Sequence, residues 1–319
     1  MATYFIGAGL ETYQHSPTLV TDQDGGIRIS PPAGIGFADG YLVDAATGLR
    51  TAQKSIWAHI QMSNNTADGE CIVFRNSDGI DVFRLTAPSL WNLQAQRRTG
   101  GAWVNVGDPV YVNGSYTFDF RIVVHPSSGR LAWVINGTSA FDLTGLDTSD
   151  LKDVALMRLK CPTGRDGAST TYSGAIVASY NTIGHTVRRR TPNGDVQKGW
   201  TGSYADVDES INDDSDAINT SIVGAVSTFT ASNLGATAPG NVIKAVAVSA
   251  RIRNDGGDVP RNAQAVLTID GVDYSQPYNL VVGPGFSGAS TVFDLNPATG
   301  QKWGSIAEVN QPFGLRATD

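Results

Sequence analysis

The sequence has few of the residues that carry most metal and redox chemistry. It has 2 cysteines and 4 histidines in 319 residues. Cys71 and Cys161 form neither a Cys-x-x-Cys nor a His-Cys spacing, so nothing indicates a zinc site. Both cysteines lie in apolar, strand-like segments. We expect two buried, reduced thiols, with a disulfide or a metal pair as the alternatives.

Catalytic and nucleotide-binding motifs are also scarce. His15, His59, His125 and His185 lie in four separate segments, and Ser287 lacks the final glycine of a nucleophile elbow. The glycine-rich stretches at 7–9 and 34–40 have neither the dinucleotide nor the P-loop spacing. His125 therefore reads as a strand-end residue that is hydrogen-bonded to a hairpin. We expect no catalytic residues and no nucleotide site.

Long apolar runs are absent, and the net charge is −7. No stretch of eighteen apolar residues occurs, and Met1 to Leu10 lack the basic segment of a signal peptide. The acidic balance argues against binding to nucleic-acid phosphates. These features predict a protein that is made and kept in the cytosol, without membrane insertion and without a nucleic-acid partner.

The clearest pattern present is a meander of three strands between Tyr116 and Phe141. Apolar residues alternate with polar ones from Tyr116 to Val124, and the alternation returns from Leu131 to Ile135. Residues 126–129 form a hairpin turn between them, and Asn136-Gly137 forms a second, tight turn. The pattern predicts antiparallel strands.

Short strand-like segments separated by turn residues fill the rest of the chain. The length predicts two domains, at 1–186 and 196–319. The fold class is all-β, with two β-sandwich domains. The predicted strands of the first domain are 4–6, 27–29, 41–43, 55–62, 70–75, 80–85, 90–96, 102–106, the meander, 154–160 and 173–179. Those of the second are 226–230, 242–253, 262–269, 278–282 and 290–293.

The first domain resembles concanavalin A-like lectin or laminin G-like jelly rolls. The segments that carry the resemblance are SIWAHIQM, CIVFRNSDGIDVFRL, YTFDFRIVVHPSSGRLAWVINGTSAF and DVALMRLK. Trp57 and Asn136-Gly137 match the family's strand tryptophan and tight hairpin. The family's glucanases carry a Glu-x-Asp-x-Glu strand, which this domain lacks. The resemblance implies a glycan-binding fold rather than a glycosidase.

Carbohydrate binding needs aromatic faces and planar polar groups. The hairpin WNLQAQRRTGGAWVNVGD supplies Arg97, Arg98, Trp103 and Asp108 as candidates. Ordinary packing and solvent contact are the alternative for these residues. Trp91, Leu93 and Ala95 are two positions apart and would share one face of a strand, which predicts that Trp91 belongs to the core.

An arginine-rich segment, 187–195, separates the two predicted domains and is interpreted as a linker. Arg188, Arg189 and Arg190 are either a solvated charge run or a docking patch for an acidic neighbouring subunit. The chain after Arg190 has 7 basic and 14 acidic residues, so the acidity is concentrated behind this segment.

An acidic loop follows the linker. Asp206, Asp208, Asp213, Asp214 and Asp216 supply the hard oxygen ligands that Ca²⁺ prefers. Their spacing is not that of an EF-hand, because the glycine at position six and the glutamate at position twelve are missing. A bound Ca²⁺ is therefore one interpretation, and a solvated or arginine-paired loop is the other.

The end of the chain carries the second resemblance. Ser305 and Glu308 predict a capped short helix that ends before Pro312, with Trp303 packed on the sandwich. The segments WTGSYADVDE, SARIRNDGG and FDLNPATGQKWGSIAEVNQPFGLRA resemble the terminal domain of tailed-phage structural proteins.

This resemblance implies a virion component, either on the tail (a tail fibre or tail tip) or decorating the head. The expected partners are other virion proteins, further copies of the chain in a symmetric homo-oligomer, and a host surface polysaccharide. The expected function is structural and non-enzymatic, with glycan binding by the first domain. The alternatives are a purely structural decoration or assembly protein and a polysaccharide-degrading enzyme, which would need paired carboxylates in a groove.

Overall fold

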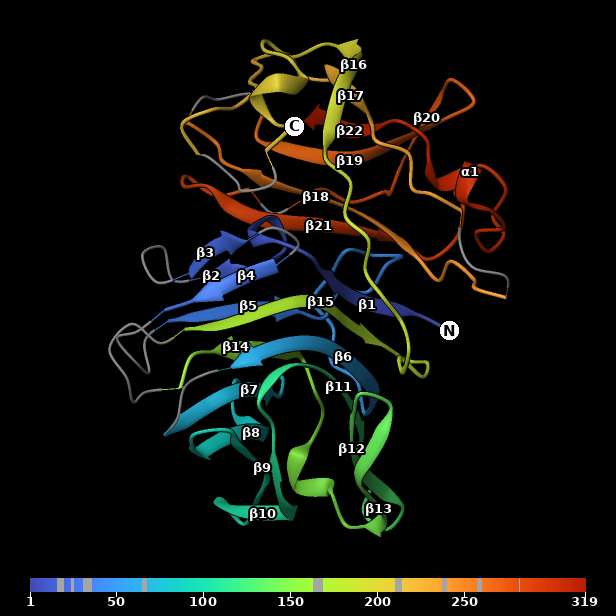
Figure 1. Cartoon of the computed structure of the whole chain (residues 1–319). Helices are drawn as coiled ribbons and strands as arrows, with labels where there is room; N and C mark the ends of the chain where they lie inside the picture. Colours follow the sequence, from blue (N-terminus) through green and yellow to red (C-terminus); the bar gives the residue numbers. More distant parts are fainter. Residues whose placement is uncertain are drawn as a thin grey trace. The chain divides into compact units, whose positions relative to one another are not determined.

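A computed structural model describes residues 1–15, 20–23, 26–30, 36–64, 68–162, 169–209, 214–236, 240–256, 260–280 and 282–319. The structure is almost entirely antiparallel β (Figure 1). It divides into two compact units, one of residues 1–43 and 50–187, the other of residues 44–49 and 188–319. The all-β fold class predicted from the sequence is confirmed.

The first unit is a sandwich of two sheets, described here for the residues given above. In spatial order the eight-stranded sheet contains β13 (Thr138–Leu146), β12 (Gly129–Ile135), β11 (Gly114–Val123), β6 (Ser55–Asn64), β15 (Thr170–Ala178), β4 (Gly26–Ile29) and β3 (Val20–Gln23), with β1 (Thr3–Gly7) also on β15. The seven-stranded sheet contains β10 (Ala102–Tyr111), β9 (Asn92–Thr99), β8 (Asp81–Ser89), β7 (Gly69–Arg75), β14 (Leu156–Lys160), β5 (Phe37–Tyr41) and β2 (Gln14–His15). Two short 3₁₀ helices, η1 (Leu10–Thr12) and η2 (Ser149–Leu151), complete the unit.

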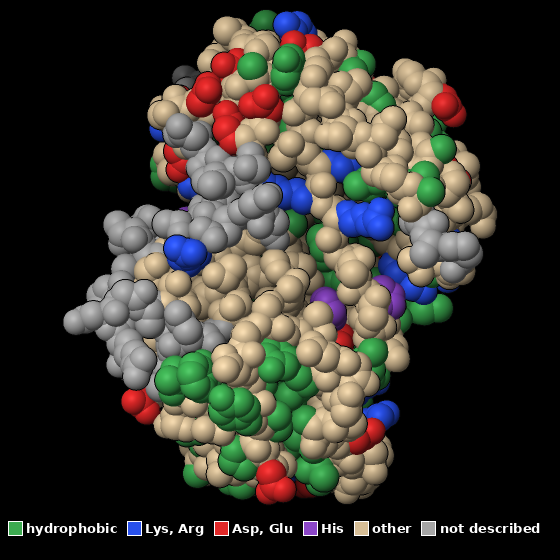
Figure 2. Space-filling view, in the orientation of Figure 1, with side chains coloured by type: hydrophobic (Ala, Val, Ile, Leu, Met, Phe, Trp, Pro, Cys, Tyr) green, Lys and Arg blue, Asp and Glu red, His purple; other side chains and the backbone are tan. Residues whose placement is uncertain are grey.

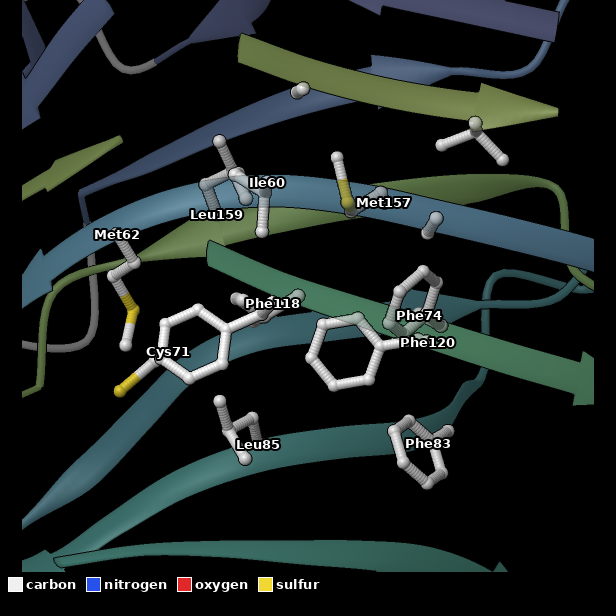
Figure 3. Packing of buried hydrophobic residues seen from close by; sticks show 14 of the residues in the cluster. Ile60, Met62, Cys71, Phe74, Phe83, Leu85, Phe118, Phe120, Met157 and Leu159 are labelled. Carbon is white, nitrogen blue, oxygen red and sulfur yellow. The ribbon is translucent and has the colours of Figure 1, made fainter. Parts of the chain in front are cut away.

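The core lies between these two sheets because each strand alternates apolar and polar side chains. Phe118 and Phe120 of β11 are fully buried, and the ring of Phe120 meets those of Phe74 and Phe83 from the opposite sheet (Figure 3). The rings of Phe74 and Phe120 pack edge to face with their centroids 5.5 Å apart. Burial of each such side chain contributes about 1.5–3 kcal/mol. The meander that the sequence predicts is therefore the centre of the core.

The predicted turns of the meander are present. Asn136 and Gly137 have φ values of 48° and 79°, so both take the left-handed conformation that the tight hairpin needs. At the other hairpin, the Nδ1 atom of His125 accepts hydrogen bonds from the backbone N–H groups of Ser127 (3.1 Å) and Ser128 (2.9 Å). The interpretation of His125 as a strand-end residue bonded to its hairpin is confirmed.

The predicted thiols are also confirmed. Cys71 and Cys161 are both buried and free. Burial raises the pKa of each thiol, with the charge of the other cysteine adding to the effect at Cys71. Both therefore stay protonated and act as small apolar residues.

The second unit is a smaller sandwich, again counted over the described residues. Its five-stranded sheet contains β16 (Pro192–Lys198), β17 (Val226–Ala231), β22 (Phe313–Thr318), β19 (Asn262–Ile269) and β20 (Val272–Ser275). A two-stranded sheet contains β18 (Val246–Ile252) and β21 (Ser287–Phe293), and η3 (Tyr204–Asp206) and α1 (Ile306–Val309) lie in the connections. Trp303 is buried before α1, and its indole N–H donates to the carbonyl oxygen of Phe293 at 2.9 Å, as the predicted packing requires.

Several element predictions are corrected. The predicted linker 187–195 overlaps β16, which pairs with β17, since residues with weak strand propensity can still form an edge strand when a partner is present. The predicted strand 278–282 is a single bridge at Leu280, with residue 281 outside the described residues. The strand predicted at 41–43 lies at Phe37–Tyr41, and β22 was not predicted because its glycine and arginine interrupt the apolar alternation.

Candidate functional site

The seven-stranded sheet carries a continuous polar surface on the side that faces away from the core. Met157, Leu159 and Phe74 point into the core, so their strand neighbours point outward. One register row crosses six strands of this outward face and consists of Asp39, Arg158, Val73, Arg84, Gln96 and Asn105. We call the outward face of this sheet the polar face. It brings together residues from segments more than one hundred positions apart.

The centre of the polar face is a chain of ion pairs and hydrogen bonds around Arg84. The Nη1 atom of Arg84 donates to Oε1 of Glu70 at 2.7 Å, and its Nε atom donates to Oε1 of Gln96 at 2.8 Å. Lys160 donates to the second oxygen of Glu70, and Gln96 donates to Oδ1 of Asn105 at 2.8 Å. The side chains of Glu70 and Arg84 are 19% and 20% exposed. The network is thus held in fixed geometry while part of it stays open to solvent.

Glu70 is ionised throughout the neutral range. Its burial would by itself raise the pKa of the carboxyl group, but the hydrogen bonds and charges of Lys160 and Arg84 outweigh that effect and lower the pKa. A second pair on the same face has similar geometry, since Arg158 donates through Nε and Nη2 to both oxygens of Asp39, each at 2.6 Å. Both carboxylates are therefore held as ion-pair acceptors.

Three aromatic rings on the polar face each have an arginine stacked on them. The guanidinium carbon of Arg84 lies 4.0 Å from the ring centroid of Trp103. Arg158 lies 4.3 Å from the centroid of Phe37. Arg50 lies 3.5 Å from that of Tyr41. Such stacking is favourable and fixes the plane of each guanidinium.

The structure brings together only part of the predicted glycan site. Arg98 and Trp103 are register partners on β9 and β10 and share the polar face. Arg97 has the opposite parity, and its Nη1 atom donates to the carbonyl oxygen of Asp147 at 2.8 Å, so it belongs to the other side of the sheet. Asp108 is exposed in the bulge of β10 between Val106 and Val110. The use of these residues in glycan binding stays a prediction.

Most of the polar face was not found from the sequence. Arg84, Glu70, Lys160 and Arg158 lie in segments that were used only to predict strands. A signal was present, because in FRL and MRLK a charged residue stands between apolar ones. That alternation places a charge on the outward face, but the register between strands is needed to bring the charges together.

The prediction that Trp91 belongs to the core is wrong. Trp91 lies in the turn between β8 and β9 with φ of 62°, and it is only half-buried. Its ring meets that of Tyr111 edge to face with centroids 6.1 Å apart. Because the turn interrupts the strand, the parity argument from Leu93 does not extend to it.

The acidic loop lies in the second unit, and Figure 2 shows acidic side chains gathered on the upper part of that unit. Asp206 accepts hydrogen bonds from the backbone N–H of Ser203 (2.7 Å) and caps η3. Asp214 accepts from Nε and Nη2 of Arg251 at 2.8 and 2.6 Å. Asp208 and Asp216 lie in the described part of the loop, whereas Asp213 lies outside the described residues. No group of three potential metal ligands occurs among the residues that the structure describes.

Arg190 is an internal clamp of the second unit rather than an open docking residue. Its Nε and Nη2 atoms donate to the carbonyl oxygens of Ser232 and Ala231, both at 2.9 Å, and Nη1 donates to that of Val309 at 2.8 Å. Burial lowers the pKa of its guanidinium. Arg188 donates to the carbonyl oxygen of Gly235 at 3.4 Å, and Arg189 is also partnered. A docking role for the triplet is thus left to Arg188 and Arg189.

The outward side of the eight-stranded sheet holds a buried polar cluster. The Nδ1 atom of His59 lies 2.9 Å from Oδ1 of Asp119, which also accepts from the hydroxyl of Thr182 at 2.9 Å. All three residues are less than 5% exposed. A ligand cannot reach this cluster, so we assign it a structural role.

Comparisons with known proteins give fold similarity only. No family model and no curated protein matches the chain. Among solved structures, the chain is similar to an endo-β-1,4-glucuronan lyase from the fungus Trichoderma reesei, with 11% identity and a TM-score of 0.36 over 53% of this chain and 87% of that one. It is also similar to the CBM2 module of the evolved Dit of Lactobacillus casei BL23 phage J-1, with 13% identity and a TM-score of 0.36 over 56% and 96%.

A third similar structure is the receptor-binding domain of a botulinum neurotoxin C/D mosaic serotype, with 9% identity and a TM-score of 0.37 over 56% of this chain and 43% of that one. Similarity at this level carries no argument about ligand or reaction.

Among the residues that the structure describes, none of the helices has the length and the apolar composition needed to cross a bilayer.

Proposed function

We propose that this chain is a non-enzymatic structural component of a tailed-phage virion, and that its first unit binds a host surface glycan on the polar face. The observation that carries the proposal is the network around Arg84, which presents amide, guanidinium and carboxylate groups in fixed positions on one sheet face. Planar groups of these kinds are suited to hydrogen-bond pairs of sugar hydroxyls. Because the network is already ordered, a ligand does not have to order it.

The virion assignment is supported by the sequence of the second unit. The segment from Trp303 to Leu315 resembles the ending of tailed-phage structural proteins, and it forms α1 and β22 at the centre of that unit's packing. In this arrangement the second unit anchors the chain to the particle or makes the homo-oligomer. Several copies on one particle would then raise the avidity of a weak glycan site.

The ion pairs of the polar face favour binding over cleavage. A glycosidase needs one carboxyl group with a raised pKa to act as an acid. Glu70 has a lowered pKa, so it is better suited to hold cations than to deliver a proton, and Asp39 accepts two hydrogen bonds from Arg158.

The test is binding of the purified full chain to bacterial surface polysaccharides, with and without EDTA, while polymer length is followed by size-exclusion chromatography. We expect saturable binding with unchanged polymer length. Loss of binding in EDTA would indicate a bound cation, for which the acidic loop of the second unit, with Asp206, Asp208, Asp213, Asp214 and Asp216, is the predicted site. Shortening of the polymer would overturn the non-enzymatic part of the proposal.

A matched pair of variants locates the site. Trp103→Ala removes the ring that supports Arg84, whereas Val104→Ala changes an adjacent residue that is 46% exposed and has the opposite parity. We expect weaker binding only for Trp103→Ala. If both variants bind the glycan equally well, the polar face is not the binding site. If the wild-type chain does not bind at all, a purely structural decoration or assembly protein is favoured.

A further inference from the structure

The polar face has an excess of positive charge, although the whole chain has a net charge of −7. Its side chains include six basic residues and four acidic ones, counting Asp108 at the edge of the sheet. The basic residues are Arg50, Arg75, Arg84, Arg98, Arg158 and Lys160, and the acidic ones are Asp39, Glu70, Asp81 and Asp108.

The ion pairs do not neutralise all of this positive charge. Glu70 accepts from both Arg84 and Lys160, so one carboxylate faces two cations. Arg98 forms no ion pair with any residue that the structure describes, and it is only half-buried beside Trp103. The N–H groups of Arg98 are therefore open to a ligand on the part of the face where Arg84 is held flat by the same tryptophan.

Tyr111, at the end of β10, is exposed, but the three aromatic rings beside the ion pairs are poorly placed to stack on neutral sugars. One face of each of the Trp103, Phe37 and Tyr41 rings is already covered by an arginine, at 4.0, 4.3 and 3.5 Å. These rings orient guanidinium groups instead of offering an open platform. An oriented guanidinium recognises carboxylate or sulfate oxygens best, since it can donate two parallel hydrogen bonds.

From this arrangement we infer that the ligand of the polar face is an anionic polysaccharide, bearing carboxylate or sulfate groups, with Arg98 as its principal ionic contact. The inference rests on the proposed glycan-binding function and names its ligand class. Arg84 and Lys160 contribute the neighbouring positive charge. The ion-paired carboxylates of Glu70 and Asp39 oppose non-specific binding of polyanions.

The experiment measures binding of the full chain to polygalacturonate and dextran sulfate, and to methyl-esterified polygalacturonate and dextran as neutral counterparts, between 50 and 500 mM NaCl. We expect binding to at least one anionic polymer, about 10-fold or more tighter than to its neutral counterpart, and weakened by salt. Arg98→Gln should weaken that binding about 10-fold, whereas Arg130→Gln should leave it unchanged. Arg130 is a suitable control because it pairs with Asp142 on the opposite sheet.

The outcomes separate the two proposals. Equal or better binding to the neutral polymers overturns the anionic ligand but leaves glycan binding in place. Binding to neither kind of polymer overturns the anionic ligand as well, and the panel of bacterial polysaccharides then decides whether glycan binding itself survives. Equally tight binding of a single-stranded DNA oligonucleotide, or no effect of Arg98→Gln, would show non-specific polyanion binding and contradict the inference.

Discussion

At the scale of single residues, the ion pairs of the polar face connect its stability to pH. The pKa of Glu70 is lowered from its ordinary value of 4.5 in the folded chain. The stabilisation from this carboxylate is therefore complete above about pH 4.5 and is lost as pH falls through the lower, folded-state pKa. We expect the melting temperature of the wild-type chain to fall more steeply below pH 4.5 than that of Glu70→Gln. Parallel pH profiles measured by circular dichroism would contradict this prediction.

Arg190 gives a second prediction at this scale. Arg190→Ala removes three donors and leaves the carbonyl oxygens of Ala231, Ser232 and Val309 without this partner. Ala231 is buried whereas Ser232 is exposed, and a buried polar group left unpaired costs about 1–3 kcal/mol, so we expect a loss of about 1–3 kcal/mol in the free energy of unfolding. Urea denaturation measures it, with the exposed Lys302→Ala as a control that should change nothing. If both variants unfold alike, the clamp has no energetic role.

The buried cluster of His59, Asp119 and Thr182 is a third residue-scale case. Asp119→Ala would leave a buried imidazole and a buried hydroxyl without their shared acceptor. We expect a loss of about 3–5 kcal/mol in the free energy of unfolding of the first unit. Asp142 also points outward from this sheet but is exposed, so Asp142→Ala should lower the free energy of unfolding by less than about 1 kcal/mol. A similar cost for both variants would contradict the assignment of a structural role to the cluster.

At the scale of elements, the turn between β12 and β13 determines the register of the meander. Gly137 has φ of 79°, which an L-residue adopts at a cost of about 1–2 kcal/mol. A methyl group at this position meets no atom within 4 Å, so the cost of Gly137→Ala is conformational rather than steric. We expect a loss of about 1 kcal/mol, measured by urea denaturation. Gly283→Ala, which is also unobstructed and lacks a positive φ, is the control and should show no loss.

At the scale of the whole molecule, a virion component is expected to form a symmetric oligomer. Light scattering of the full chain over a wide concentration range should show a species of more than one copy. The oligomer should dissociate more slowly from an anionic polysaccharide immobilised at high density than from the same polymer immobilised at low density, because several sites engage at once. A monomer at every concentration would contradict the predicted homo-oligomer.

Much of the fold follows from local sequence. The period-two alternation determined which residues of β11 and β12 enter the core, and Asn136-Gly137 determined the tight turn between β12 and β13, because both effects act over a few neighbouring residues. The hairpin between β9 and β10 places Arg98 opposite Trp103, of which the sequence predicted only that both lie near its turn. Residues 187–195 were misread because edge-strand pairing depends on β17, which lies more than 25 positions away.

The polar face depends on tertiary structure. Glu70, Arg84 and Lys160 come from three strands, and only the order β8-β7-β14 and its register bring their charges together. The sequence by itself determined that Arg84 and Lys160 point outward, since that choice depends on the alternation within one strand, whereas Glu70 reaches the polar face through the irregularity of β7 between Glu70 and Ile72. Which of them become ion-pair partners, and which arginine keeps its charge open to a ligand, was decided by strand pairing, because charges interact over a few ångströms in space and not along the chain.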